Sequence, residues 1–250
     1  MGSSRSSDAW DRVARSYFHA SQPPSYRVGL AGPGDREGLQ RAGEALRAGV
    51  SELERCVGEL ELCGVQIGSH VNDWNLSDPA LFDIFAACAE LGAAVFVHPW
   101  DMMGQDAMRK YWLPWLVGMP AETSRAICSM IFGGVLERLP RLRVAFAHGG
   151  GSFPATLGRI EHGHRVRPDL VAVDNERGPR EYVDRLVFDS LVHDPAALRF
   201  LIDLATPERI ALGTDYPFPL GELQPGALID TLEGIDDDAR HRMLWGTAFE

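Results

Sequence analysis

The stretch RVAFAHGGG, residues 143–151, places a short apolar run directly before a histidine and three glycines. Two other stretches repeat this arrangement: AAVFVHPWD at 93–101 ends its run on His98, and RIALGTDYP at 209–217 leads to Asp215. Near-continuous apolar runs of this length are typical of strands in a parallel sheet that helices cover on both faces. We therefore expect a parallel sheet with polar groups at the ends of several strands.

Strands and helices alternate along the rest of the chain. Further β-rich runs lie at 27–30, 64–69 and 185–192, and amphipathic helical patterns lie at 38–60, 78–92, 122–140 and 194–205. No GxGxxG or GxxxxGK[ST] stretch follows a strand, so a nucleotide-binding fold has no support. The predicted fold class is α/β, a (β/α)8 TIM-like barrel whose chemistry sits where the strands end.

The number of strands predicts that this barrel is incomplete. The chain has about six strand–helix units, whereas a closed barrel of this type has eight. The run that leads to Asp215 is followed by a helix and the end of the chain, so the deficit lies at the front. We expect about the first two units to be missing, and residues 27–250 to form a partial barrel. Residues 1–26, with Ser, Arg and Gln-Pro-Pro, are expected to be poorly structured.

Length and composition indicate one large domain with a substantial core. Of the 250 residues, 45% are hydrophobic, and no apolar run is long enough to span a membrane or to serve as a secretory signal. The net charge of -11 disfavours nucleic acid or an anionic membrane as a partner. The four cysteines form no CxxC pair, which favours reduced, buried thiols in a cytoplasmic protein.

Three polar residues at strand ends, His98, His148 and Asp215, predict a metal or acid–base site. A catalytic zinc needs about three or four protein ligands, and His98 with Asp215 supplies only two. The one His-x-His pair, His162 and His164, follows a helical pattern rather than a strand, so we do not expect it to complete the site. We therefore expect the two missing zinc ligands to belong to the same absent segment as the two missing strands.

From about residue 50 to 247, the chain resembles the 2-amino-3-carboxymuconate-6-semialdehyde decarboxylase family of the metal-dependent amidohydrolase superfamily. The resemblance is carried by GVQIGSHVNDW (64–74), VFVHPWDM (95–102), KYWLPWLVGMPAETSRAICSMIFGGV (110–135), FAHGGGSFPATLGRI (146–160), RPDL (167–170), LVHDP (191–195) and LGTDYPFPLGEL (212–223). The run from 110 to 135 is far longer than a generic motif. The family's first strand, with a His-x-His pair and a nearby substrate-binding Arg, has no counterpart here.

The resemblance implies zinc-dependent decarboxylation of a small dicarboxylate substrate in tryptophan and kynurenine degradation, impaired in this chain. It implies that His98 and Asp215 are zinc ligands and that His148 is the acid–base residue. It further implies a homodimer in which an arginine reaches the substrate carboxylate in the partner subunit's pocket. The residues implied to contact substrate are the aromatic walls Trp112 and Phe218, the cross-subunit Arg159, and Arg167 as a second arginine.

Alternative interpretations remain open. The chain could be a related decarboxylase or hydrolase acting on a hydroxybenzoate-like acid, because a fold alone does not define a substrate. It could also be a catalytically dead fragment. Trp112 could serve only in packing and Arg159 could be an ordinary surface charge, while His193 is expected to cap or pack a helix. The sequence assigns no role to Asp189.

Overall fold

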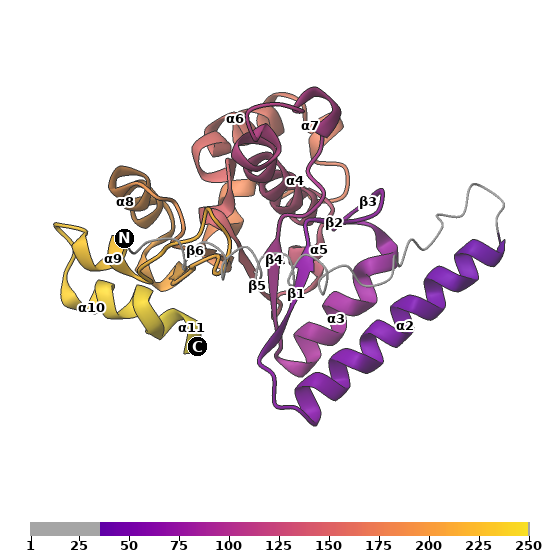
Figure 1. The fold of residues 1–250 in the computed structure, drawn as a ribbon. Coiled ribbons are helices and arrows are strands. Elements are labelled where there is room, and N and C mark those ends of the chain that lie inside the picture. The colour runs from indigo at the N-terminus through magenta and orange to yellow at the C-terminus, as the bar shows by residue number, and fades with distance from the viewer. Residues whose placement is uncertain (1–35, 250) are drawn as a thin grey trace.

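The structure, a computed structural model, describes residues 36–249, with side chains from residue 44 onward. The predicted strand at 27–30 and the stretch 1–26 lie outside the described residues. The described strands form a five-stranded parallel sheet of order β1-β4-β5-β6-β7 (Figure 1), and β2 and β3 form a separate antiparallel pair. The strands are β1 (Gly64–Gly68), β2 (His70–Val71), β3 (Trp74–Asn75), β4 (Ala94–His98), β5 (Arg143–Phe146), β6 (Leu186–Asp189) and β7 (Ile210–Ala211).

Helices connect each strand of the sheet to the next. The α-helices are α2 (Arg36–Gly58), α3 (Phe82–Leu91), α4 (Met119–Phe132), α5 (Val135–Arg138), α6 (Phe153–Val166), α7 (Pro168–Val171), α8 (Pro195–Ala205), α9 (Ala227–Thr231), α10 (Asp237–His241) and α11 (Thr247–Phe249). Shorter turns of 3-10 or π type are η1 (Pro79–Leu81), η2 (Gln105–Ala107), η3 (Pro114–Gly118), η4 (His148–Gly150), η5 (Pro179–Arg185), η6 (Pro207–Arg209) and η7 (Arg242–Gly246).

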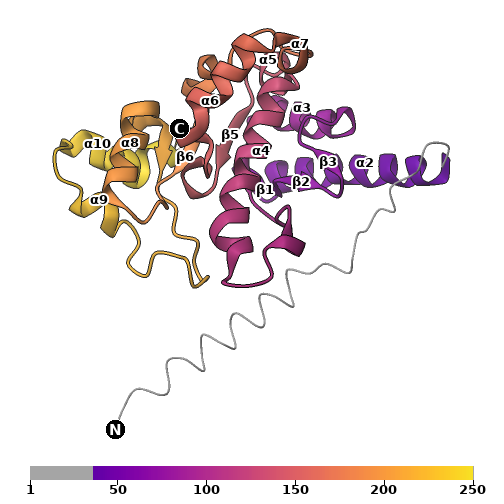
Figure 2. The same ribbon diagram turned by 90° about the horizontal axis from the view of Figure 1, so that it is seen from above.

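The sheet order confirms an incomplete TIM-type barrel. Neighbouring strands of the sheet follow one another along the chain, as in an arc of a (β/α) barrel. Within residues 36–249 the arc is open, with β1 and β7 at its two edges. Helix α2 packs beside α3, and α4 packs against α6 (Figure 2).

Apolar side chains of the strands form the core, as the sequence pattern predicts. Val95 and Val97 of β4, and Val144 and Phe146 of β5, are at most 1% exposed. These four side chains lie on one face of the sheet, because alternate residues of a strand point to opposite faces. The residues between them, such as Phe96 and Ala145, are only partly buried, so the other face of these two strands is less covered than the sequence pattern predicts.

Helix starts also follow the sequence. The Asp78 side chain accepts a hydrogen bond from the Ala80 N–H at the start of η1, and Asp194 accepts one from Ala197 at the start of α8. His193 neither caps nor packs against the helix, as was expected of it, because Asp194 is the N-cap of α8 and His193 is exposed.

The cysteines and the surface complete the description. All four cysteines are free thiols, and burial raises the pKa of Cys88 to about 11. The expectation of buried thiols is wrong for Cys63, which is exposed just before β1. No helix within residues 36–249 combines the length and the apolar character needed to cross a bilayer.

Candidate metal centre

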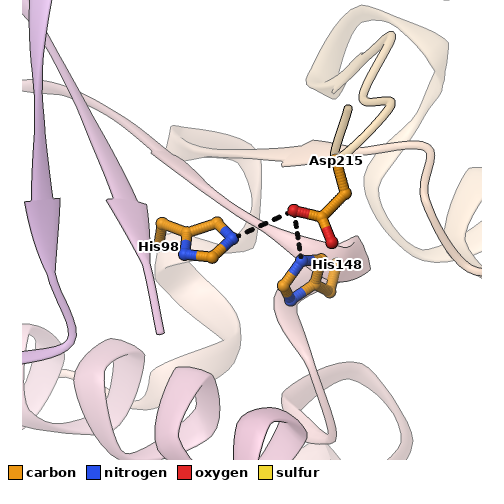
Figure 3. Close-up of side chains that lie close together, drawn as sticks. All are labelled: His98, His148 and Asp215. Carbon is orange, nitrogen blue, oxygen red and sulfur yellow. Dashed lines mark hydrogen bonds and ion pairs between the residues drawn. The ribbon is translucent and has the colours of Figure 1, made fainter. Parts of the chain in front are cut away.

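Three side chains from separate strand ends meet at one point (Figure 3). His98 is the last residue of β4, His148 opens η4 after β5, and Asp215 lies in the loop after β7. Asp215 Oδ1 is 3.3 Å from His98 Nε2 and 3.7 Å from His148 Nε2. The two imidazole rings meet edge to face, with centroids 4.9 Å apart. The structure thus brings together the three residues that the sequence places at strand ends.

The backbone turns sharply at two of these residues. His148 has a φ of 57° and Asp215 a φ of 50°, which is the left-handed region that side-chain-bearing residues rarely adopt. Glycine is needed beside His148, because a Cβ on Gly149 would fall 2.4 Å from Val192 Cγ1. Such unusual backbone angles persist only where the surrounding structure holds them, and they cluster at functional sites.

Partial burial and mutual contact shape the electrostatics of the cluster. The side chains of His98, His148 and Asp215 are 18%, 16% and 10% exposed. Burial raises the pKa of Asp215, but the hydrogen-bonding and charge interactions with both imidazoles outweigh it and hold that pKa well below its ordinary value. Asp215 is therefore kept as a carboxylate, the form that binds a metal ion.

The donor set and its spacing fit a metal ion. Two imidazole nitrogens and one carboxylate oxygen, all within 4.8 Å of one another, suit zinc or a similar transition metal. Bonds of about 2.1 Å in a tetrahedral site separate two ligand atoms by roughly 3.4 Å. The distances from Asp215 to His98 and His148 are close to that spacing. Residues 36–249 contain no other cluster of this kind.

The His-x-His pair lies elsewhere, as the sequence predicts. His162 and His164 lie on α6, where the His164 ring stacks on Phe132 with 6.2 Å between centroids. His162 Nδ1 is 2.8 Å from the Arg165 guanidinium. Neither imidazole belongs to the cluster around Asp215.

The four residues expected to contact substrate do not converge as His98, His148 and Asp215 do. The Phe218 N–H donates to the Asp215 carbonyl (2.8 Å), so Phe218 is close to the centre. Trp112 lines a cavity of about 510 Å³ with Trp115 and Arg109. Arg159 is exposed on α6, and Arg167, at the end of that helix, is paired with Asp169 at 2.7 Å. Their roles in binding stay predictions.

Sequence reasoning missed a buried carboxylate beside the site. Glu122 of α4 is fully buried; it accepts hydrogen bonds from the Met103 N–H (2.7 Å) and from Ser69 Oγ (3.1 Å). Arg125 lies 2.7 Å from it. Glu122 thus ties the end of β1 to the loop that follows His98. A glutamate at an inward position of an otherwise apolar helix face is the sequence feature that could have revealed it.

Replacing Glu122 with alanine is expected to lower the free energy of unfolding by about 3 kcal/mol, because it leaves the Arg125 guanidinium and the Met103 N–H without their acceptor and removes one of the two acceptors of Ser69 Oγ. Urea denaturation measures the change. Glu52→Ala, which breaks an exposed pair with Arg55, is the matched control and is expected to have no measurable effect. Equal stabilities for the two variants would contradict this account of Glu122.

Comparison with known proteins agrees with the fold described above. The family model described as "Amidohydrolase" matches residues 12–250. The chain is 59% identical over 207 residues to 2-amino-3-carboxymuconate-6-semialdehyde decarboxylase of Dictyostelium discoideum, covering 83% of this chain and 58% of that protein. It is 40% identical over 227 residues to the Caenorhabditis elegans protein of the same name, covering 79% and 56%. The chain therefore spans less than two thirds of the length of either relative.

Among solved structures, 5-carboxyvanillate decarboxylase from Sphingomonas paucimobilis superposes with a TM-score of 0.73 and 30% identity, over 82% of this chain and 63% of that one. A dihydroxybenzoic acid decarboxylase from Polaromonas, solved with bound manganese, has a TM-score of 0.67 and 21% identity, over 96% and 72%. The second likeness shows the fold alone.

Proposed function

This chain belongs to the amidohydrolase family, and we propose that it is part of a metal-dependent carboxy-lyase that converts 2-amino-3-carboxymuconate-6-semialdehyde to 2-aminomuconate-6-semialdehyde. The convergence of His98, His148 and Asp215 at the strand ends carries the proposal. The names of the relatives at 59% and 40% identity supply the substrate. Zinc as the metal, a homodimer and a place in tryptophan degradation by the kynurenine route are parts of the same proposal.

In this proposal, His98 Nε2 and an Asp215 oxygen hold the metal. When bound, zinc lowers the pKa of water towards neutrality and stabilises negative charge that develops on the substrate. Asp215 contributes a carboxylate whose charge the two imidazoles maintain. The ion would thus be held at the ends of β4 and β7, against the sheet edge where the loops of a barrel form the active site.

His148 moves the proton in this reaction. When the carboxylate leaves as carbon dioxide, the carbon that carried it must take up a proton. An imidazole has an unperturbed pKa of about 6.5, so it can accept and return a proton near neutral pH. His148 Nε2 faces Asp215, and its side chain is partly open to solvent, so it can exchange protons with a substrate held at the metal.

Aromatic and basic side chains bind the substrate in this proposal. Trp112 and Phe218 form the walls for a planar, conjugated chain. Arg159 provides a planar fork that matches a carboxylate better than lysine does. Arg159 is exposed on α6, so its guanidinium is accessible to a partner subunit across a C2 interface, with Arg167 as a second candidate.

The cross-subunit role has a direct test. In chains joined to the family's first strand, an Arg159→Ala chain mixed with a His98→Ala chain is expected to recover activity in the heterodimer, because one of the two pockets then has both an intact metal site and an intact arginine. Turnover by the separated heterodimer, compared with each mutant homodimer, is the measurement. A Glu52→Ala chain, altered at an exposed pair with Arg55 on α2, is the control. Heterodimers as inactive as both parents would contradict the role of Arg159.

A second candidate function is decarboxylation of a hydroxybenzoate-like acid. It is favoured by the likeness to the 5-carboxyvanillate enzyme and by 26% identity over 172 residues to 6-methylsalicylic acid decarboxylase of Penicillium expansum. Both candidates use a carboxylate beside a metal, so fold and ligands do not separate them.

The assay that separates these candidates offers both substrates to the purified protein. From the chain joined to the family's first strand, we expect loss of the absorbance of the conjugated muconate semialdehyde and no change in 5-carboxyvanillate or 6-methylsalicylate. From the 250-residue chain by itself we expect little or no turnover, because the chemistry depends on a bound metal. Turnover of an aromatic acid alone would favour the second candidate. Turnover of neither by a protein that circular dichroism shows to be folded and that contains metal would identify a catalytically dead fragment.

A further inference from the structure

Asp189, the last residue of β6, is a buried carboxyl group that the mechanism above does not use. It is 7% exposed and lies outside the cluster of possible metal ligands. Its Oδ1 accepts hydrogen bonds from the backbone N–H of Gly149 (2.9 Å) and of Leu191 (3.1 Å). Burial raises its pKa, and the nearby His148 and the N–H donors oppose that rise. A carboxyl group kept in such a place needs a reason beyond filling space.

The first reason is the turn that carries His148. Four consecutive residues, 148–151, have φ values of 57°, 60°, 78° and 63°. A run of left-handed residues has no regular helix or strand ladder to hold it. The N–H groups of Gly150 and Gly151 bond within the turn, to the carbonyls of Ala147 and His148. The Gly149 N–H bonds instead to Asp189, so this carboxyl group anchors the turn to β6 directly beside His148.

The second reason is the segment that carries Asp215. Gly213, two residues earlier, lies so close to Asp189 that a Cβ there would fall 2.6 Å from Asp189 Cγ and 2.7 Å from Asp189 Oδ2. The Gly213 N–H donates to Ser190 Oγ at 3.3 Å. The end of β6 therefore touches the backbone on both sides of the metal centre, next to His148 and next to Asp215.

We propose that Asp189 is a positioning residue that holds the His148 turn against β6, with Gly213 packed on its other side, and so sets His148 against Asp215. The effect of Asp189 on catalysis rests on the proposed function, whereas its effects on the turn and on metal binding do not. Asparagine keeps an oxygen at the position of Oδ1 and nearly the same shape, whereas leucine has a similar bulk and no acceptor.

The test compares Asp189→Asn with Asp189→Leu by amide hydrogen exchange. Leucine is expected to speed exchange at residues 149–151 by at least about 10-fold, as loss of an anchoring hydrogen bond implies. Asparagine is expected to stay within a few-fold of the unaltered protein. Leu186→Ala, at a buried site on the same strand away from the turn, is the control for general destabilisation. It should not single out residues 149–151.

Zinc affinity, measured with zinc alone by competition with a coloured chelator, is the second readout. The leucine variant is expected to bind zinc about 10–100-fold more weakly, because Asp189 packs on Gly213, two residues before the ligand Asp215, and loss of a residue that orients a metal ligand usually has an effect of this size. Asparagine should keep the affinity of the unaltered protein. Where turnover is measurable, kcat should fall with KM nearly unchanged. If the protein turns over no substrate at all, hydrogen exchange and zinc affinity still test the role of Asp189. Failure of the proposed function is therefore distinct from failure of this inference.

A variant on the opposite side keeps the proposal testable if Asp189→Leu does not fold. Gly213→Ala places a methyl group against the Asp189 carboxyl, and is expected to speed exchange at residues 149–151, with which Gly213 shares no hydrogen bond. Unchanged exchange in that segment, together with unchanged zinc affinity, in Asp189→Leu or in Gly213→Ala would overturn the proposal.

Discussion

In the chain joined to the family's first strand, replacing His148 with alanine is expected to lower kcat by about 10²–10⁴-fold and to leave the metal bound, since this is the range that a general acid–base group contributes. The reason is positional: His148 Nε2 is 3.7 Å from Asp215 Oδ1, whereas His98 Nε2 is the nearer partner of that oxygen at 3.3 Å. Steady-state kinetics on the muconate semialdehyde tests the loss of kcat, and the metal content of the same sample tests whether the metal stays bound.

Two comparisons make the His148 result specific. His162→Ala removes an exposed imidazole on α6 and is expected to leave kcat unchanged. Circular dichroism must show that the His148 variant is folded. Loss of metal from that variant would assign His148 as a third ligand, because its imidazole lies within ligand distance of the other two. A kcat within a few-fold of the unaltered protein would remove His148 from the proton transfer altogether.

Zinc binding by the 250-residue chain is expected to be weak, and joining the family's first strand, with its His-x-His pair, to the chain is expected to strengthen it by more than about 100-fold. If His148 serves as the acid–base group, only His98 and Asp215 are left as protein ligands, whereas catalytic zinc needs about three or four. The gain should exceed the roughly 10–100-fold that outer-shell partners are worth. Competition with a coloured chelator measures it, and the same addition with both histidines replaced by alanine is the control.

The ligands assigned here are tested in the same titration. His98→Ala and Asp215→Asn should each abolish the tight binding, whereas His164→Ala should not, because that ring is stacked on Phe132. Tight, stoichiometric zinc in the 250-residue chain would contradict the assignment. It would show that His148, or another group, completes the site without the added pair.

Helix starts and strand ends are the parts of the fold that local sequence describes well. Asp194 bonds the Ala197 N–H as its place before Pro195 predicts, because capping involves residues only three apart. Strand lengths follow the local sequence pattern less closely. The pattern at 209–215 predicts a longer strand than Ile210–Ala211, which is all that pairs with β6. How far a strand extends depends on its neighbours in the sheet, and local apolar content does not report them.

For the site, the sequence by itself determined that His98, His148 and Asp215 belong together. Each follows an apolar run that must be a buried strand, and the carboxyl ends of parallel strands meet on one side of a barrel. Only the tertiary structure decided what holds them there. Asp189 reaches Gly149 across 40 residues of sequence, and Glu122 reaches Ser69 across 53. Such contacts have no period along the chain, because they depend on how one strand end is placed beside the next.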